Sequence, residues 1–328
     1  MRKLDEIYPP DRISLREVGL RDGLQMVKSF PSTQGKSSWI ELEYMAGVRH
    51  FEVGSFLPET NYPMFADVCE VILAVDALAG AHGAALTLNK RGIVDALQSR
   101  AGEIGCVISA TEEHNQANTR RSRQETLRDI EDLCRMRDAS DHQPLVSVGI
   151  AMSFGCSIAG TVDPDDVLRI ADACFDAGVD IVSLADTVGY AGPRQVAALS
   201  AALYRRVADR AFGVHLHDTR GMGIANAAAA LNEGVRILDG AIGGLGGCPF
   251  APNATGNIVF EDLVFLCQTY GFATDIDIEK LLKIRPLLSN EMPTEPLYGA
   301  VAAAGLPMNG MAGIKQAENQ KPTEGVTL

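Results

Sequence analysis

The amino-acid sequence predicts a closed (β/α)8 barrel, the TIM barrel, followed by extra C-terminal helices. Short apolar runs alternate with helical segments of about 12 to 18 residues, as in parallel βα units. The alternation repeats eight times within roughly 250 residues, which suits a closed barrel better than an open doubly wound sheet. The glycine-rich dinucleotide fingerprint expected after the first strand of such a sheet is also absent.

The eight predicted strands are apolar runs rich in β-branched residues. Several of the helices between them end at glycine, for example at Gly47, Gly178 and Gly234, where a left-handed C-cap precedes the next strand. After the seventh strand, Asp218 or Thr219 can cap the following helix. The strands are predicted at residues 13–19, 49–55, 84–89, 103–110, 145–153, 179–186, 211–217 and 236–244, with helices at 37–47, 124–139, 163–178 and 192–207.

The chain divides into three parts. Residues 1–271 hold the barrel, which we expect to be the catalytic domain. Residues 272–306 contain two predicted helices, around 277–290 and 295–305, that we expect to pack on the barrel, with a dimer contact as the alternative role. Residues 307–328 are polar and punctuated by proline and glycine, so we expect a flexible tail.

Composition excludes several classes of partner. The formal net charge of −13 argues against nucleic acid, whose binding needs concentrated lysine and arginine. No apolar run approaches the roughly 18 to 20 residues of a membrane span, and the first residues lack the apolar centre of a signal peptide, so we expect a cytoplasmic protein without a membrane partner. The seven scattered cysteines argue against a disulfide framework and structural zinc.

A barrel places its active site at the carboxyl ends of its strands. Polar side chains fall at five of these ends, and a glycine-rich segment follows the eighth strand. Together they indicate a site, although any one of them alone reads as a solvated loop residue. They are Arg21 and Asp22 after the first strand, Glu52 in the second, Asn89 after the third, Asp186 after the sixth, and His215 and His217 in the seventh.

The two histidines raise the question of a metal. Residues two apart on a strand share a face, so His215 and His217 point the same way; a hydrogen-bonded core pair is the alternative interpretation. Asp22 is close in a barrel because only the eighth strand separates the seventh from the first. With an amide oxygen from Asn257, the set has two nitrogens, two oxygens and no thiolate, which favours Mg²⁺ or Mn²⁺ over structural zinc.

The motifs "EVGLRDGLQ", "FEVGSF", "SLADTVG", "VHLHDTRGMGIANAAAALNEGV" and "GGLGGCPFAPNATGNIVFEDLV" resemble the 3-hydroxy-3-methylglutaryl-CoA lyase family. This family belongs to the metal-dependent TIM-barrel lyases and Claisen-condensing enzymes, and the likeness covers nearly all of residues 13–270. The RDG and HxH motifs are shared with isopropylmalate-type synthases and aldolases. The loop with Cys248 is much more particular to the lyases.

The resemblance implies cleavage of a 3-hydroxyacyl-CoA thioester into acetyl-CoA and a keto acid, in a homo-oligomer (dimer or tetramer). It implies that Arg21 polarises the thioester carbonyl, that Cys248 is a mobile-loop catalytic thiol, and that supporting acids surround them. The base that takes the hydroxyl proton stays open between Asp22, Asp186, His215 and a metal-bound water. The implied metal ligands are Asp22, His215, His217 and Asn257; the acids are Glu52, Asp186 and Glu261; and the predicted substrate or CoA contacts are Lys28, Asn89, Lys90, Arg91 and Arg120 to Arg123.

The sequence departs from the family pattern after Glu52, in the loop after the fifth strand, and before Lys28. These loops surround the acyl pocket, so a longer or branched acyl group is an alternative to the family's parent substrate. Three other functions compete with the lyase: a Claisen synthase, an acyl-CoA sensor that kept the fold, and an aldolase for a free hydroxy-oxoacid. The Cys248 loop argues against the synthase, and the complete set of matched residues argues against the sensor.

Overall fold

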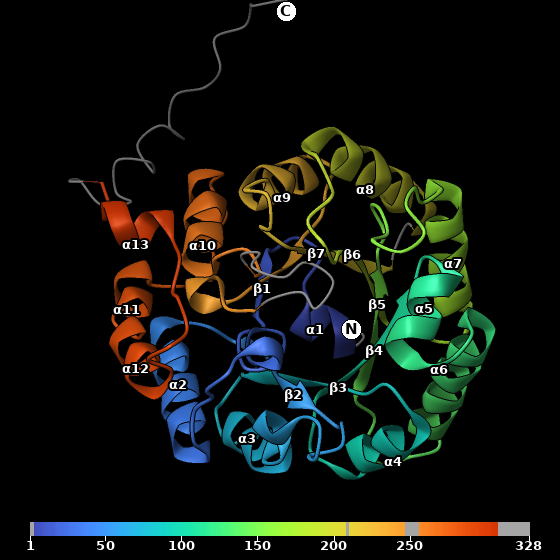
Figure 1. Cartoon of the computed structure of the whole chain (residues 1–328), viewed down its shortest axis with the longest axis horizontal. Coiled ribbons are helices and arrows are strands. Elements are labelled where there is room, and N and C mark those ends of the chain that lie inside the picture. Colours follow the sequence, from blue (N-terminus) through green and yellow to red (C-terminus); the bar gives the residue numbers. More distant parts are fainter. Residues whose placement is uncertain (1–2, 208–209, 247–255, 308–328) are drawn as a thin grey trace, which may run out of the picture.

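The computed structural model confirms the barrel, and it describes residues 3–207, 210–246 and 256–307. Eight parallel strands close in chain order, with β8 paired to β1 (Figure 1). Each observed strand overlaps the run predicted for it. The strands are β1 (Ser14–Glu17), β2 (His50–Ser55), β3 (His82–Leu86), β4 (Glu103–Ser109), β5 (Leu145–Ala151), β6 (Ile181–Asp186), β7 (Ala211–Leu216) and β8 (Ile237–Gly240).

Helices surround the strands, and several begin at a residue that caps the first turn. The side chains of Ser32, Asn89, Ser122 and Asp163 each accept a backbone N–H there. Within the described residues, no helix is long and apolar enough to cross a bilayer. The outer helices are α2 (Thr33–Ala46), α3 (Val68–Asp76), α4 (Lys90–Gln98), α5 (Glu112–Thr119), α6 (Arg123–Asp138), α7 (Pro164–Asp176), α8 (Pro193–Val207), α9 (Gly223–Asn232) and α10 (Phe260–Thr269), and the short 3-10 turns are η1 (Gly23–Met26), η2 (Pro63–Phe65) and η3 (Ile242–Gly244).

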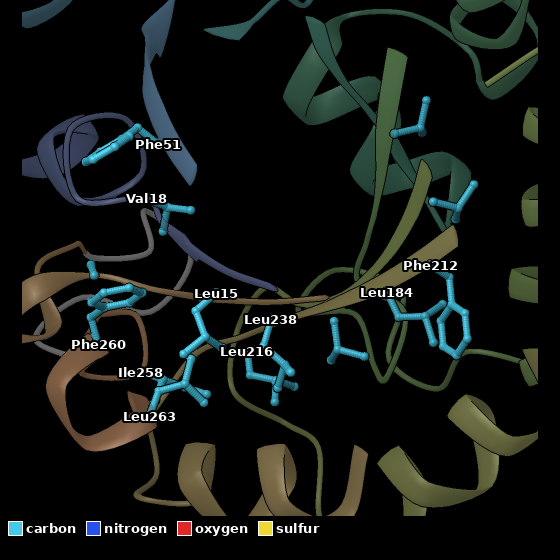
Figure 2. Packing of buried hydrophobic residues seen from close by; sticks show 14 of the residues in the cluster. Leu15, Val18, Phe51, Leu184, Phe212, Leu216, Leu238, Ile258, Phe260 and Leu263 are labelled. Atoms are coloured by element: carbon cyan, nitrogen blue, oxygen red, sulfur yellow. The ribbon is translucent and has the colours of Figure 1, made fainter. Parts of the chain in front are cut away.

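The main core lies between the barrel wall and the helices. Side chains alternate along a strand, so every second residue faces outward and packs against the helical layer. Figure 2 shows Leu15, Leu216 and Leu238 of neighbouring strands in this layer, with Leu263 of α10 beside them. The inward positions are thereby left for the site.

A helix that the sequence analysis missed, α1 (Lys3–Ile7), closes the amino end of the barrel. Leu4 and Tyr8 pack there against the inward-facing Ile181 and Ile237. The Tyr8 hydroxyl donates a hydrogen bond of 2.8 Å to Glu103 on β4. The barrel is therefore sealed at the end opposite the predicted site.

The predicted number of helices after the barrel was wrong. Up to residue 307, where the described part ends, three are present, α11 (Ile278–Leu282), α12 (Arg285–Glu291) and α13 (Ala300–Ala304), because the segment predicted as one helix at 277–290 is interrupted at Lys283 and Ile284. Pro286 explains the interruption, since it has no N–H and its ring clashes with the carbonyl four residues earlier. The three helices lie beside α2 and α10 (Figure 1).

Candidate active site

Three of the predicted metal ligands meet at the carboxyl end of the barrel. Asp22 lies in the turn after β1, His215 on β7, and His217 just beyond it. The Oδ2 atom of Asp22 is 3.4 Å from Nε2 of His217 and 4.0 Å from Nε2 of His215, and the two Nε2 atoms are 3.1 Å apart. Within the described ranges, this is the one cluster of three histidine, cysteine or acidic side chains close enough to share an ion.

Asn257 completes the cluster. Its Nδ2 donates to Asp22 Oδ2 at 2.8 Å and to the Leu245 carbonyl at 3.0 Å, while its Oδ1 is buried without a hydrogen-bond partner. A buried acceptor normally has a partner, so this oxygen is free to bind a cation. Two imidazole nitrogens, a carboxylate and an amide oxygen fit a divalent ion such as Mg²⁺ or Mn²⁺.

The electrostatics of the cluster also favour a cation. Burial favours the neutral form of Asp22, but Arg21 and the two histidines hold its pKa well below the ordinary range. Burial lowers the pKa of His215, yet its hydrogen bond to Asp239 and the charge of Asp22 outweigh burial and raise it. Asp22 and Asp239 thus stay ionised on either side of the His215 ring, and their negative charge attracts a cation to this point.

Arg21 is held rigidly beside this cluster. Its Nε lies 2.8 Å from Oε1 of Glu52, and its Nη1 donates to Asp22 Oδ1 at 2.6 Å. Burial raises the pKa of Glu52 although Arg21 opposes the shift. A guanidinium fixed between two acids keeps one orientation, which suits it to stabilise charge on a substrate oxygen.

Two predicted acids, Asp186 and Glu261, do not line the cavity at this site. Asp186 accepts the backbone N–H groups of Tyr190 and Ala191, at 2.8 and 3.1 Å, and so holds the turn after β6. Glu261, in the first turn of α10, accepts the N–H of Gly243 at 3.0 Å and pairs with Arg285 at 2.7 Å. Their catalytic role stays a prediction.

The predicted CoA contacts lie outside the cavity as well. Lys28 is exposed, and its backbone N–H donates to Glu295. Asn89 caps α4 by accepting the N–H of Gly92 at 2.9 Å. Lys90 and Arg91 follow Asn89 in the chain, and Nζ of Lys90 lies 3.3 Å from Oδ2 of Asp132.

The remaining basic residues are paired or highly exposed. The Arg91 side chain is 93% exposed, with Asp95 3.7 Å away. Arg123 pairs with Glu112 at 3.2 Å. Cys248, the predicted catalytic thiol, lies outside the described residues.

The cluster of Asp22, His215 and His217 lies at the top of a cavity of about 170 Å³ that runs down the inside of the barrel. Sequence reasoning missed its floor. Arg16 lies there and donates to Asp239 at 2.7 and 3.0 Å, to Glu103 at 3.3 Å, and to Ser183 at 3.2 Å. Two adjacent charges in the first strand, Arg16 and Glu17, were the available signal, because one of two successive strand residues must face inward.

Comparison with known proteins gives a consistent result. The family model described as HMGL-like matches residues 12–288. The hydroxymethylglutaryl-CoA lyase YngG of Bacillus subtilis is 34% identical over 86% of this chain and 94% of its own length. The (R)-citramalyl-CoA lyase of Chloroflexus aurantiacus is 34% identical over 90% of this chain and 95% of its own length.

A solved structure of an HMG-CoA lyase from Acinetobacter baumannii, in complex with coenzyme A and 3-methylmalate, is also similar. It superimposes with a TM-score of 0.83 at 30% identity, covering 90% of this chain and 96% of the other. The likeness therefore extends over the whole barrel.

Proposed function

Because the chain belongs to the HMGL-like family of lyases, we propose that it cleaves a 3-hydroxyacyl-CoA thioester into acetyl-CoA and a keto acid with a bound divalent metal ion. The observation that carries this proposal is the cluster of Asp22, His215 and His217, with the unpartnered Asn257 oxygen, directly beside Arg21. The parent substrate of the family, 3-hydroxy-3-methylglutaryl-CoA, is the first candidate.

The reaction breaks a carbon–carbon bond next to a thioester. Removal of the proton from the 3-hydroxyl lets its oxygen form a ketone, while the bond between carbons 2 and 3 breaks and its electron pair passes to the thioester as an enolate. A proton then adds to carbon 2 and gives acetyl-CoA. The enolate is the species that most needs stabilisation, and Arg21 can bind the oxygen on which its charge develops.

The residues of the cluster would hold the ion and keep it oriented. A divalent ion bound by Asp22, His215, His217 and Asn257 supplies Lewis acidity that makes the substrate hydroxyl more acidic. Asp239, 3.0 Å from Nδ1 of His215, leaves Nε2 of that ring facing Asp22. We include in the proposal that Cys248, the catalytic thiol implied by the family resemblance, takes part in proton transfer to carbon 2, since a thiol near a cation and an arginine is more easily ionised.

The test follows acetyl-CoA release from 3-hydroxy-3-methylglutaryl-CoA and related thioesters with Mg²⁺ or Mn²⁺. We expect His217→Ala to lower kcat/KM by about a thousandfold or more, because a ligand and a preorganised site are lost together. His142→Ala is the matched control, since that ring bonds the Ala101 carbonyl at 2.8 Å and does not line the cavity. Full activity after removal of divalent ions, verified by metal analysis, contradicts the proposal.

A further inference from the structure

One side of the cavity, on β4 to β6, is lined mostly by small residues. Strand register places Val107, Gly149 and Ser183 side by side on these strands, and all three line the cavity. Barrel interiors are normally filled by layers of bulky branched side chains. Here only Val107 among these three supplies such a side chain, so the interior stays open.

The levels above and below repeat the pattern. At the height of His215, its neighbour on β6 is Ala185. Below, Gly105 on β4 pairs with Ser147 on β5, and both line the cavity. The open space therefore extends from the metal cluster down through the middle of the barrel.

The chemistry of the floor decides what this space can hold. Arg16 is the cation there, and the carboxylates of Asp239 and Glu103 already neutralise it. A carboxylate of the substrate placed here would lie against these two acids and against a guanidinium that already pairs with both of them. Between the floor and the metal cluster the lining includes the apolar side chains of Val18, Leu86 and Val107, and the Ser183 hydroxyl is already bonded to Arg16. An uncharged apolar group fits this part of the cavity.

We propose that the carbon bearing the substrate's hydroxyl also carries an apolar branch larger than methyl, which extends into the barrel past Gly149 and Gly105. A cavity of about 150 Å³ holds a benzene ring, so 170 Å³ shared with the reacting carbons leaves room for a branch of about two to four carbons. The inference rests on the proposed function, because the metal cluster is what places the reacting carbon at the top of this wall.

The two glycines can be filled without straining the backbone. A Cβ atom added at Gly149 meets nothing nearer than the Cys106 carbonyl oxygen, at 3.9 Å. At Gly105 the nearest atom is Cδ1 of Leu86, at 3.5 Å. Neither glycine has a positive φ. Side chains placed here therefore occupy the cavity itself.

The experiment measures kcat/KM for acetyl-CoA release from 3-hydroxy-3-alkylglutaryl-CoA thioesters whose alkyl group is methyl, ethyl, propyl or butyl. We expect the wild-type enzyme to prefer one of the longer branches over methyl by about tenfold or more, since one methylene in an apolar pocket changes kcat/KM by roughly 10- to 200-fold. Gly149→Val should reverse the order, lowering kcat/KM for the propyl thioester about thirtyfold or more and for the methyl thioester less than about threefold.

Two smaller substitutions complete the set. Gly149→Ala should shift the preference part of the way, while Gly192→Ala, which has no atom within 4 Å of the added Cβ, should leave the order unchanged. If thermal unfolding shows that Gly149→Val does not fold, Gly105→Ala replaces it, and the expected result is the same partial shift as for Gly149→Ala.

The possible failures are distinguishable. A wild-type enzyme that prefers methyl, or a Gly149→Val variant that loses activity equally on every thioester, overturns the branch and leaves the proposed function standing. Release of acetyl-CoA from none of the four thioesters overturns both.

Discussion

Two clusters of buried acids lie on opposite sides of β1, and their pKa values move in opposite directions. On the inner side, burial favours neutral acids, but Arg16 lowers the pKa of Asp239 to about 2, and His82 with Arg16 lowers that of Glu103 to about 2. On the outer side, burial raises the pKa of Glu17 to about 8 against two backbone hydrogen bonds. Nearby, burial and then Glu17 raise the pKa of Glu43 well above its ordinary value.

Burial is complete on both sides, so the facing cations decide the difference. The inner acids face Arg16, Arg21 and imidazoles, whereas Glu17, Glu43 and Glu261 share one paired cation among the described residues, Arg285. On the inner side Asp22, Asp239 and Glu103 stay ionised, and Asp22 can hold a metal. On the outer side the pKa values of Glu17 and Glu43 are raised, and Glu17 and Glu261 hold backbone N–H groups.

The outer cluster fixes the beginning of the segment after β8. Glu17 accepts the N–H of Ile242 at 3.0 Å, and Glu261 accepts that of Gly243 at 3.0 Å. Arg285 of α12 binds Glu261 and the Leu297 carbonyl. The helices after the barrel are thereby tied to the rim of the active site.

Removing Arg285, the cation of the outer cluster, should have the largest effect on stability. Arg285→Met leaves Glu261 buried without a counter-charge, which raises its pKa in the folded protein further above the unfolded value. Stability conferred by a proton that only the folded state binds is lost as pH rises, so we expect a loss of about 3 kcal/mol in the free energy of unfolding at pH 8 and a smaller one at pH 5.

Urea denaturation at the two pH values measures the effect of Arg285→Met. Arg100→Met, which breaks an exposed pair with Asp76, is the control and should cost under about 0.5 kcal/mol. An equal loss for Arg285→Met at both pH values would show that charge is not the cause.

On the inner side, Asp239→Asn should weaken the metal site. The substitution removes the charge that orients His215 and sets its proton position, so we expect divalent-ion affinity to fall about 10- to 100-fold. Calorimetric titration with Mn²⁺ gives the dissociation constant. Asp76→Asn, at an exposed position, should leave it unchanged. Unaltered Mn²⁺ binding by Asp239→Asn would show that Asp239 does not support the metal site.

The smallest change expected is a gain. Glu43→Gln removes an acid whose pKa burial raises well above its ordinary value in the folded protein, whereas the same acid is ionised in the unfolded chain at neutral pH. The wild type loses stability as pH rises above the unfolded pKa, and the variant does not, so we expect it to be more stable by about 1 kcal/mol at pH 8 and equal near pH 4. Thermal unfolding against pH checks this, and a variant less stable at pH 8 would refute the assignment.

The barrel and the cation cluster could be predicted from sequence because each has a local signal. Strand and helix periods alternate along the chain, and the HxH pair with an acid after β1 needs only the closure of the barrel to come together. The third strand was predicted to end three residues late, at Asn89, because the strand-forming residues Thr87 and Leu88 continue its pattern, whereas the chain already turns toward the Asn89 cap of α4.

The small-residue wall and the outer acids could not be predicted in this way. Gly149 and Ser183 carry no motif, and only the register of β5 with β6 shows that they are neighbours. Glu17, Glu43 and Glu261 come from three separate elements. The order of charged residues along the chain does not show which of them lack an opposite charge in the folded protein.

The seal formed by α1 bears on the order in which products leave. Tyr8 and Leu4 close the amino end of the barrel, and Arg16 with Glu103 lies directly above, so among the described residues the reaction chamber opens at the mouth. In the proposed reaction the alkyl branch of the keto fragment lies in this chamber, while the coenzyme, too large for a cavity of about 170 Å³, lies at the mouth. The coenzyme-linked product must therefore depart first, and the keto acid follows through the passage it vacates.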